Sequence, residues 1–242
     1  MPSPADYART HADRFESDLF ELLRIPSVSA DSAHDDDTRR CCNTLADHIR
    51  GFGVDQVEVV ETGGHPAVLA SHGSDPDKPT VLIYGHYDVQ PPDPMELWDT
   101  PPFEPTVKDG HVFARGANDD KGQMMMHVKA VESFLKSGTE LPVNLKLLIE
   151  GEEEVGSKHL TDLLTKHKER LAADVVLVSD TAMFARGVPS ITSGLRGLAY
   201  IEVHVEGPTR DLHSGVFGGG VHNPLNALCE LVAQLHDDDG RI

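Results

Sequence analysis

The spacing of apolar residues along the chain predicts several helices. Over residues 5–24, Phe15, Leu19 and Leu22 recur at helical spacing on one face, and Pro26 follows as a stop signal. The same spacing predicts further helices over residues 37–51, 121–137 and 157–170. Each of these helices would turn one apolar face toward a core.

Short runs rich in β-forming residues lie between the helices. They cover residues 57–61, 67–71, 80–84, 143–150 and 174–179. The run at 80–84 is almost wholly apolar, as expected of a central strand covered on both faces. Strands that alternate with helices are typical of an α/β fold, so we expect a largely parallel central sheet flanked by helices. Residues 91–105 are rich in proline and are predicted as an irregular loop.

The pattern changes near the end of the chain. Residues 199–206 alternate apolar and polar side chains, which predicts a half-exposed strand, and a glycine-rich loop at 215–220 precedes a helix from about Asn223. We therefore assign residues 1–195 to one large domain and residues 196–242 to the beginning of a second. A lone strand and helix cannot bury a core of their own. We expect that the chain is truncated at its C-terminal end.

Charge and cysteine content narrow the possible partners. Lys and Arg total 21 against 40 Asp and Glu, a formal net charge of −19, which repels nucleic acid and anionic membrane surfaces. No apolar run approaches the ~20 residues of a membrane-spanning helix, and no signal peptide is visible. Three cysteines cannot form a disulfide framework, so we expect free thiols and a cytoplasmic location.

Candidate chemistry gathers in four motifs that follow predicted strands. They are GHYDV at residues 85–89, RGANDDKG at 115–122, EGEEEVGS at 150–157 and SD at 179–180. The C-terminal ends of strands are where open α/β sheets bind ligands. In an extended backbone His86 and Asp88 point to the same side, so Asp88 can bind one imidazole nitrogen while the other binds a metal. Each motif alone could be a helix cap or a solvated turn, but the four together predict a metal site.

With these motifs, and with DLHSG at residues 211–215, the chain resembles metallopeptidase family twenty from Ile25 to its end. This family includes carnosinases, cytosolic non-specific dipeptidases, aminoacylases, acetylornithine deacetylases and succinyl-diaminopimelate desuccinylases. EGEEEVGS and DLHSGVFGG are most similar to the dipeptidase and carnosinase branch. The resemblance implies a zinc-peptidase-like catalytic domain over residues 1–195 and the start of a smaller α+β lid and dimerisation domain over residues 196–242.

The resemblance also implies a metal centre with two divalent ions. The ions would share Asp119 as a bridging ligand. His86 and Asp180 would complete one metal site, and Glu154 would belong to the other. Zinc is the metal that the resemblance favours, with manganese and cobalt as alternatives for such oxygen and nitrogen ligands. The peptide bond between Asp119 and Asp120 would be cis.

Three further residues receive catalytic roles by resemblance. Glu153 would be the general base, and Asp88 would orient the imidazole of His86. His213 would reach the active site from the lid domain, often that of a partner subunit, and stabilise the oxyanion. A last histidine ligand would lie beyond residue 242, so we expect residues 1–242 alone to be inactive.

We therefore predict a cytoplasmic, dimetal hydrolase that cleaves the peptide bond of dipeptides or short peptides and forms a homodimer through its lid domain. An N-acyl amino-acid deacylase with the same metal centre is an alternative. An alternative of another class is a non-catalytic, truncated fragment with an incomplete metal site. The sequence assigns no role to Glu152 and does not specify which substrate side chains are preferred.

Overall fold

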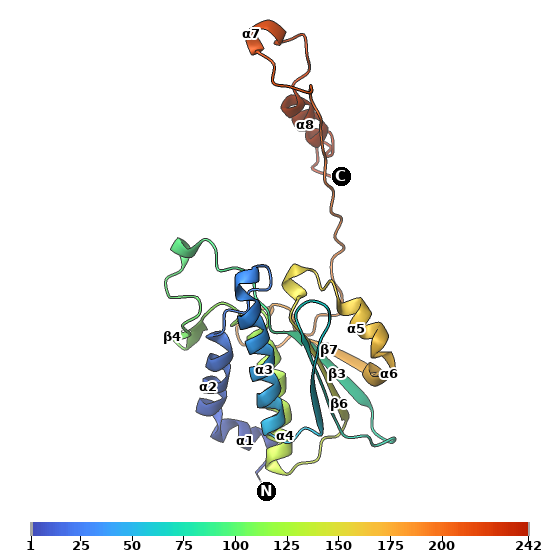
Figure 1. The fold of residues 1–242 in the computed structure, drawn as a ribbon. Helices are drawn as coiled ribbons and strands as arrows, with labels where there is room; N and C mark the ends of the chain where they lie inside the picture. Colours follow the sequence, from blue (N-terminus) through green and yellow to red (C-terminus); the bar gives the residue numbers. More distant parts are fainter. Residues whose placement is uncertain (1, 242) are drawn as a thin grey trace. The chain divides into compact units, whose positions relative to one another are not determined.

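The computed structural model describes residues 2–241 (Figure 1). Contacts within the chain divide it after Met183 into two compact units. The first unit is built around a five-stranded sheet with the order β1-β2-β6-β3-β7. The strands of this sheet are β1 (Gln56–Val60), β2 (Ala67–His72), β3 (Thr80–His86), β6 (Asn144–Glu150) and β7 (Val175–Val178). A separate ribbon pairs β4 (Thr106–Lys108) with β5 (His111–Phe113).

The central sheet is mixed. Strands β6, β3 and β7 run parallel, with His86 opposite Glu150 and Tyr84 opposite Val178. Strand β2 is antiparallel to both β6 and β1, an arrangement that lets a short connection join β1 to β2. The predicted α/β class is confirmed, and its parallel part is confined to three strands. The carboxyl ends of these three strands therefore share one edge of the sheet.

Helices cover both faces of the sheet (Figure 1). On one face, Ile83 and Leu147 point into an apolar cluster formed with α2, α3 and α4. On the other face, Leu82 and Leu148 meet Leu163 of α5, because neighbouring strand residues point to opposite sides. The helices of this unit are α1 (Pro4–Thr10), α2 (Ala12–Leu23), α3 (Asp35–Gly51), α4 (Lys121–Ser137), α5 (Leu160–Lys166) and α6 (Lys168–Leu171), with short 3-10 helices η1 (Ser32–His34), η2 (Met95–Leu97) and η3 (Glu153–Val155).

Two of the predicted helices are each divided at a histidine. The helix predicted over residues 5–24 is α1 followed by α2, with a break at His11. The ring of His11 stacks on Tyr7 with centroids 3.9 Å apart, and its Nδ1 lies 2.8 Å from the Tyr7 carbonyl oxygen. Side-chain contacts of this kind compete with the backbone hydrogen bonds of a helix. The helix predicted over residues 157–170 is α5 followed by α6, with a break at His167.

The described residues of the second unit form two helices, α7 (Ser214–Phe217) and α8 (Pro224–Ala233). The second of them begins where the sequence predicts, because the Asn223 side chain accepts a hydrogen bond from the Leu225 amide at 2.9 Å. The strand predicted over residues 199–206 is wrong for this structure, since no described strand pairs with its backbone. The assignment of residues 1–195 and 196–242 to catalytic and lid domains stays a prediction. Across the described residues, no helix is both long and apolar enough to cross a membrane.

Candidate metal centre

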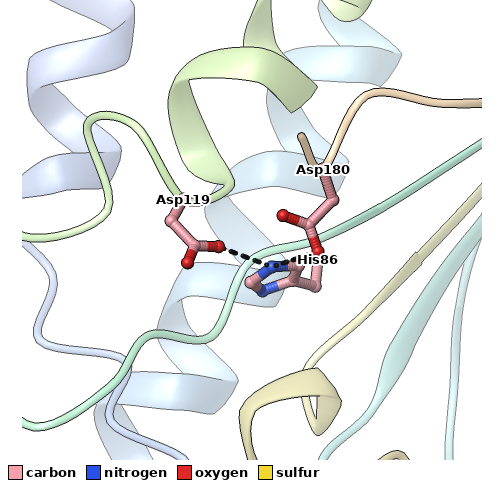
Figure 2. A group of neighbouring side chains, drawn as sticks. All are labelled: His86, Asp119 and Asp180. Carbon is pink, nitrogen blue, oxygen red and sulfur yellow. Dashed lines mark ion pairs between the residues drawn. The ribbon is translucent and has the colours of Figure 1, made fainter. Parts of the chain in front are cut away.

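Three of the predicted metal ligands meet at the carboxyl edge of the parallel strands (Figure 2). His86 is the last residue of β3, Asp180 follows β7, and Asp119 lies in the turn before α4. The Nε2 atom of His86 is 3.2 Å from Asp119 Oδ1 and 3.7 Å from Asp180 Oδ2. One ligand atom from each residue lies within 4.8 Å of the other two. The structure thus brings together the side chains expected at one of the two metal sites.

The chemistry of these three side chains fits a divalent metal ion. Nε2 of His86 is buried and has no hydrogen-bond partner among the described residues. Ligand atoms bound to zinc at about 2.1 Å in a tetrahedron lie about 3.4 Å apart. The distances of 3.2 and 3.7 Å from Nε2 to the two carboxylates are close to that spacing. One imidazole and two carboxylates are a donor set that zinc accepts.

The contacts of His86 leave its Nε2 atom free to bind a metal. Nδ1 lies 3.1 Å from the backbone oxygen of Asp88 and 3.3 Å from its Oδ1, so Nδ1 carries the proton that Asp88 accepts. Burial by itself lowers the pKa of His86, but the hydrogen bond and the negative charge of Asp88 raise it to about 10. A metal binds the neutral imidazole and therefore competes with a proton at Nε2.

Asp88 has more partners than the sequence indicates. Its side chain is fully buried, and Oδ2 accepts hydrogen bonds from Ser29 Oγ at 2.6 Å and from the Glu154 amide at 3.1 Å. Its other oxygen, Oδ1, accepts the Glu153 amide at 3.3 Å. One carboxylate therefore orients the imidazole of His86 and also fixes the start of helix η3.

Glu153 and Glu154 have different neighbours. Glu153 is half-buried, with Oε2 4.0 Å from Nε2 of His86. Burial raises the pKa of Glu153, His86 counteracts this rise, and the charge of Asp180 adds to it. Burial also raises the pKa of Glu154, whose Oε2 accepts a hydrogen bond from Gln90 Nε2 at 2.8 Å. Glu154 is outside the cluster of three ligands described above.

Two acidic neighbours to which the sequence assigns no role have structural ones. Asp120 is buried, and its Oδ2 accepts the His86 amide at 3.1 Å. Burial raises the pKa of Asp120 to about 6. The Asp119–Asp120 bond is cis, as the resemblance implies. Glu152 is buried and pairs with His159 Nδ1 at 2.8 Å, which joins η3 to the start of α5.

His213 belongs to the second unit. It is exposed and stands at the start of α7. Its Nδ1 accepts a hydrogen bond from the Gly215 amide at 3.0 Å, so Nε2 carries the proton when the ring is neutral. The role of His213 at the active site stays a prediction.

Comparison with known proteins decides the family. The sequence pattern of Peptidase family M20/M25/M40 matches residues 82–222, a range that includes every motif from GHYDV to DLHSG. The chain belongs to this peptidase family. The resemblance found in the sequence is thereby confirmed, and the three converging residues predicted as metal ligands lie within the matched range.

Relatives of this M20 chain include two dipeptidases. Cys-Gly metallodipeptidase dug1 of Schizosaccharomyces pombe is 40% identical over 246 residues, which cover 95% of this chain and 51% of the relative. Beta-Ala-His dipeptidase of Homo sapiens is 37% identical over 251 residues, which cover 98% of this chain and 49% of the relative. Both names agree with the dipeptidase and carnosinase branch.

A solved structure supports the fold of the M20 chain. The crystal structure of Sso-CP2, an M20 family metallo-carboxypeptidase from Sulfolobus solfataricus, matches with a TM-score of 0.77 at 35% identity. The match covers 94% of this chain and 51% of that one. The chain therefore spans about half the length of the relatives that it matches.

Proposed function

We propose that the full-length protein is a metal-dependent hydrolase that cleaves dipeptides or short peptides. The observation that carries the proposal is the meeting of Asp119 and Asp180 with the buried Nε2 of His86, which has no hydrogen-bond partner among the described residues. The relatives named for Cys-Gly and Beta-Ala-His dipeptidase activity favour a dipeptide over an N-acyl amino acid as substrate.

The chain's own residues would hold two divalent ions, with zinc as the preferred metal. His86 and Asp180 would hold one ion together with Asp119, and Asp119 would share its second oxygen with an ion bound by Glu154. In support, the Asp119 side chain is 59% exposed and so has an oxygen available on its open side. When bound, such ions polarise a scissile carbonyl and lower the pKa of a water molecule toward about 7.

Glu153 is the proposed general base. Its carboxylate faces Nε2 of His86, and its raised pKa brings it nearer to the neutral range in which a base is most effective. Glu153 would take a proton from the attacking water and deliver it to the leaving amine as the C–N bond breaks. Its carboxylate is then restored for the next turnover. Asp88 would hold the backbone of Glu153 in place for both transfers.

A substrate panel with the full-length protein tests this proposal. The panel contains Cys-Gly, β-Ala-His and an N-acyl amino acid, and the variants are Glu153→Gln and, as a matched control, Glu169→Gln on the exposed surface of α6. We expect hydrolysis of dipeptides, with kcat lowered by about 10²–10⁴-fold in Glu153→Gln only and metal content unchanged. Preference for the acyl amino acid would support a deacylase instead. Loss of metal in Glu153→Gln would reverse the roles of Glu153 and Glu154.

Three finer expectations belong to the same proposal. A cytoplasmic location is supported by Cys41 and Cys42, which are buried free thiols. The residues from 196 onward are proposed to form a homodimer interface, and sedimentation of the full-length protein would test whether it is a dimer. His213 is proposed as a donor to the oxyanion, so His213→Ala should lower kcat without removing metal.

A further inference from the structure

Lys121 is a buried charge that the proposed reaction does not use. Its side chain is 0% exposed, and its ammonium donates to the carbonyl oxygens of Leu22 at 2.9 Å and Ile25 at 2.8 Å. Burial lowers the pKa of this lysine. A buried ammonium is unfavourable unless hydrogen-bonded, and the carbonyls at the C-terminal end of α2 supply the partial negative charge that offsets its burial.

The position of Lys121 links it to the metal centre. It is the first residue of α4 and follows directly after Asp119 and Asp120. Asp120, the residue between Asp119 and Lys121, accepts a hydrogen bond from the amide of His86. The two residues that follow Asp119 are therefore held by separate contacts, Asp120 by the backbone of β3 and Lys121 by the backbone at and just after the end of α2.

The segment that receives the ammonium also contacts the residues that follow β3. Residues 22–29, here called the anchor segment, continue from the end of α2 past β3. Ser27 Oγ donates to the Tyr87 carbonyl at 2.7 Å, and Ser29 Oγ donates to Asp88 Oδ2 at 2.6 Å. One short stretch of chain thus contacts the residues that follow His86 and also the lysine at the start of α4, two residues after Asp119.

We propose that the anchor segment fixes Asp119 relative to His86, and that Lys121 is the positioning residue through which it does so. The inference rests on the proposed metal centre and deepens it. Ligands must be held within about 0.5 Å of their working geometry, and supporting residues of this kind typically change metal affinity by about 10- to 100-fold. Among the described residues, the hydrogen bonds of the Lys121 ammonium go to backbone oxygens and to none of the proposed ligands, so Lys121 would act through the backbone of the turn.

The test compares two buried lysines of α4 by their effect on Zn²⁺ affinity, measured by competition with a chelator. Lys121→Met keeps an apolar side chain of similar length and removes the ammonium. Lys129→Met is the matched control, because Lys129 is also buried and also joins α4 to α2, through Asp18 at 2.6 Å. We expect both variants to melt at a lower temperature, and only Lys121→Met to bind Zn²⁺ about 10- to 100-fold more weakly.

The possible outcomes separate this inference from the proposed function. Wild-type Zn²⁺ affinity in folded Lys121→Met, or equal weakening in both lysine variants, would overturn the positioning role. Wild-type affinity in His86→Ala would instead show that the metal centre itself is misassigned. If Lys121→Met does not fold, Ser29→Ala tests the anchor segment from the side of Asp88. Weaker Zn²⁺ binding in Ser29→Ala supports the anchor, and unchanged binding overturns it.

Discussion

The two sides of the candidate metal centre are built in different ways. The His86 side, made of His86, Asp119 and Asp180, stands on the ends of parallel strands and on the turn before α4. The Glu154 side, made of Glu154 and Gln90, stands on the short helix η3 and on the loop after β3. Sheet topology brings His86 and Asp180 together on the His86 side, and the turn before α4 adds Asp119 as the third proposed ligand. Among the described residues, the Glu154 side contains one carboxylate with an amide partner and no group of three ligands.

This difference shows that a side chain outside a strand needs another group to hold its backbone in position. Strand-end residues are positioned by the hydrogen bonds of the sheet itself, as His86 is opposite Glu150. Helix η3 has no such frame, and Asp88 supplies one by accepting the amides of Glu153 and Glu154. A single buried carboxylate thereby couples the two sides of the centre.

The largest expected effect comes from removing the imidazole of the His86 side. In His86→Ala the tightest Zn²⁺ binding should weaken by more than about 100-fold, because a direct ligand is lost rather than a supporting contact. Isothermal titration calorimetry measures the change. His111→Ala, at an exposed histidine of β5, should bind Zn²⁺ as the wild type does. Equal binding in both variants would remove His86 from the centre.

Asp88→Asn should weaken Zn²⁺ binding less than His86→Ala does, and it should affect both sides of the centre. The amide keeps the size of the carboxylate, but it removes the charge that orients His86 and one acceptor for the amides of η3. Zn²⁺ affinity should fall by about 10- to 100-fold. Asp162→Asn, at an exposed position of α5, is the control in the same calorimetric titration. If Asp88→Asn binds Zn²⁺ normally, then the backbone alone positions the imidazole.

Zn²⁺ affinity on the His86 side should also depend on pH. The pKa of His86 in the metal-free protein is raised to about 10, so below that pH its Nε2 must lose a proton before a metal binds. Zn²⁺ affinity on the His86 side should therefore rise about tenfold for each pH unit between roughly pH 6 and 8. Equilibrium dialysis at several pH values measures the slope. A flat response would mean that the imidazole is already neutral in this range.

The smallest effect is expected from Gln90→Ala, which acts on the Glu154 side alone. Loss of the hydrogen bond to Glu154 Oε2 should free that side chain and weaken the second, lower-affinity metal site by about 2- to 10-fold. Tight binding at the His86 side should not change. A Co²⁺ titration followed by absorbance separates the two steps, and a change in the first step would contradict the division of the centre into two sides.

The His86 side is predictable from the sequence because of topology. Polar motifs follow strands, and parallel strands end at one edge, so His86 and Asp180 had to be near each other. The contacts of Lys121 and Ser29 are not predictable in this way. They join residues far apart in the chain, and the lysine binds backbone oxygens that leave no pattern of residue types. The strand predicted over residues 199–206 is wrong for a different reason. An alternating pattern indicates a preference for a strand, but it cannot supply the neighbouring strand with which that strand would pair.

Whether two metal ions share Asp119 is tested most directly by titrating Zn²⁺ into the wild type, Asp119→Asn and Glu154→Gln. The wild type should bind one ion tightly and a second ion more weakly. Glu154→Gln should lose the second step and keep the first, whereas Asp119→Asn should weaken both steps, because its carboxylate would serve both ions. A variant Asp119→Asn that weakens only one step would show that Asp119 belongs to one metal site and is not a bridge.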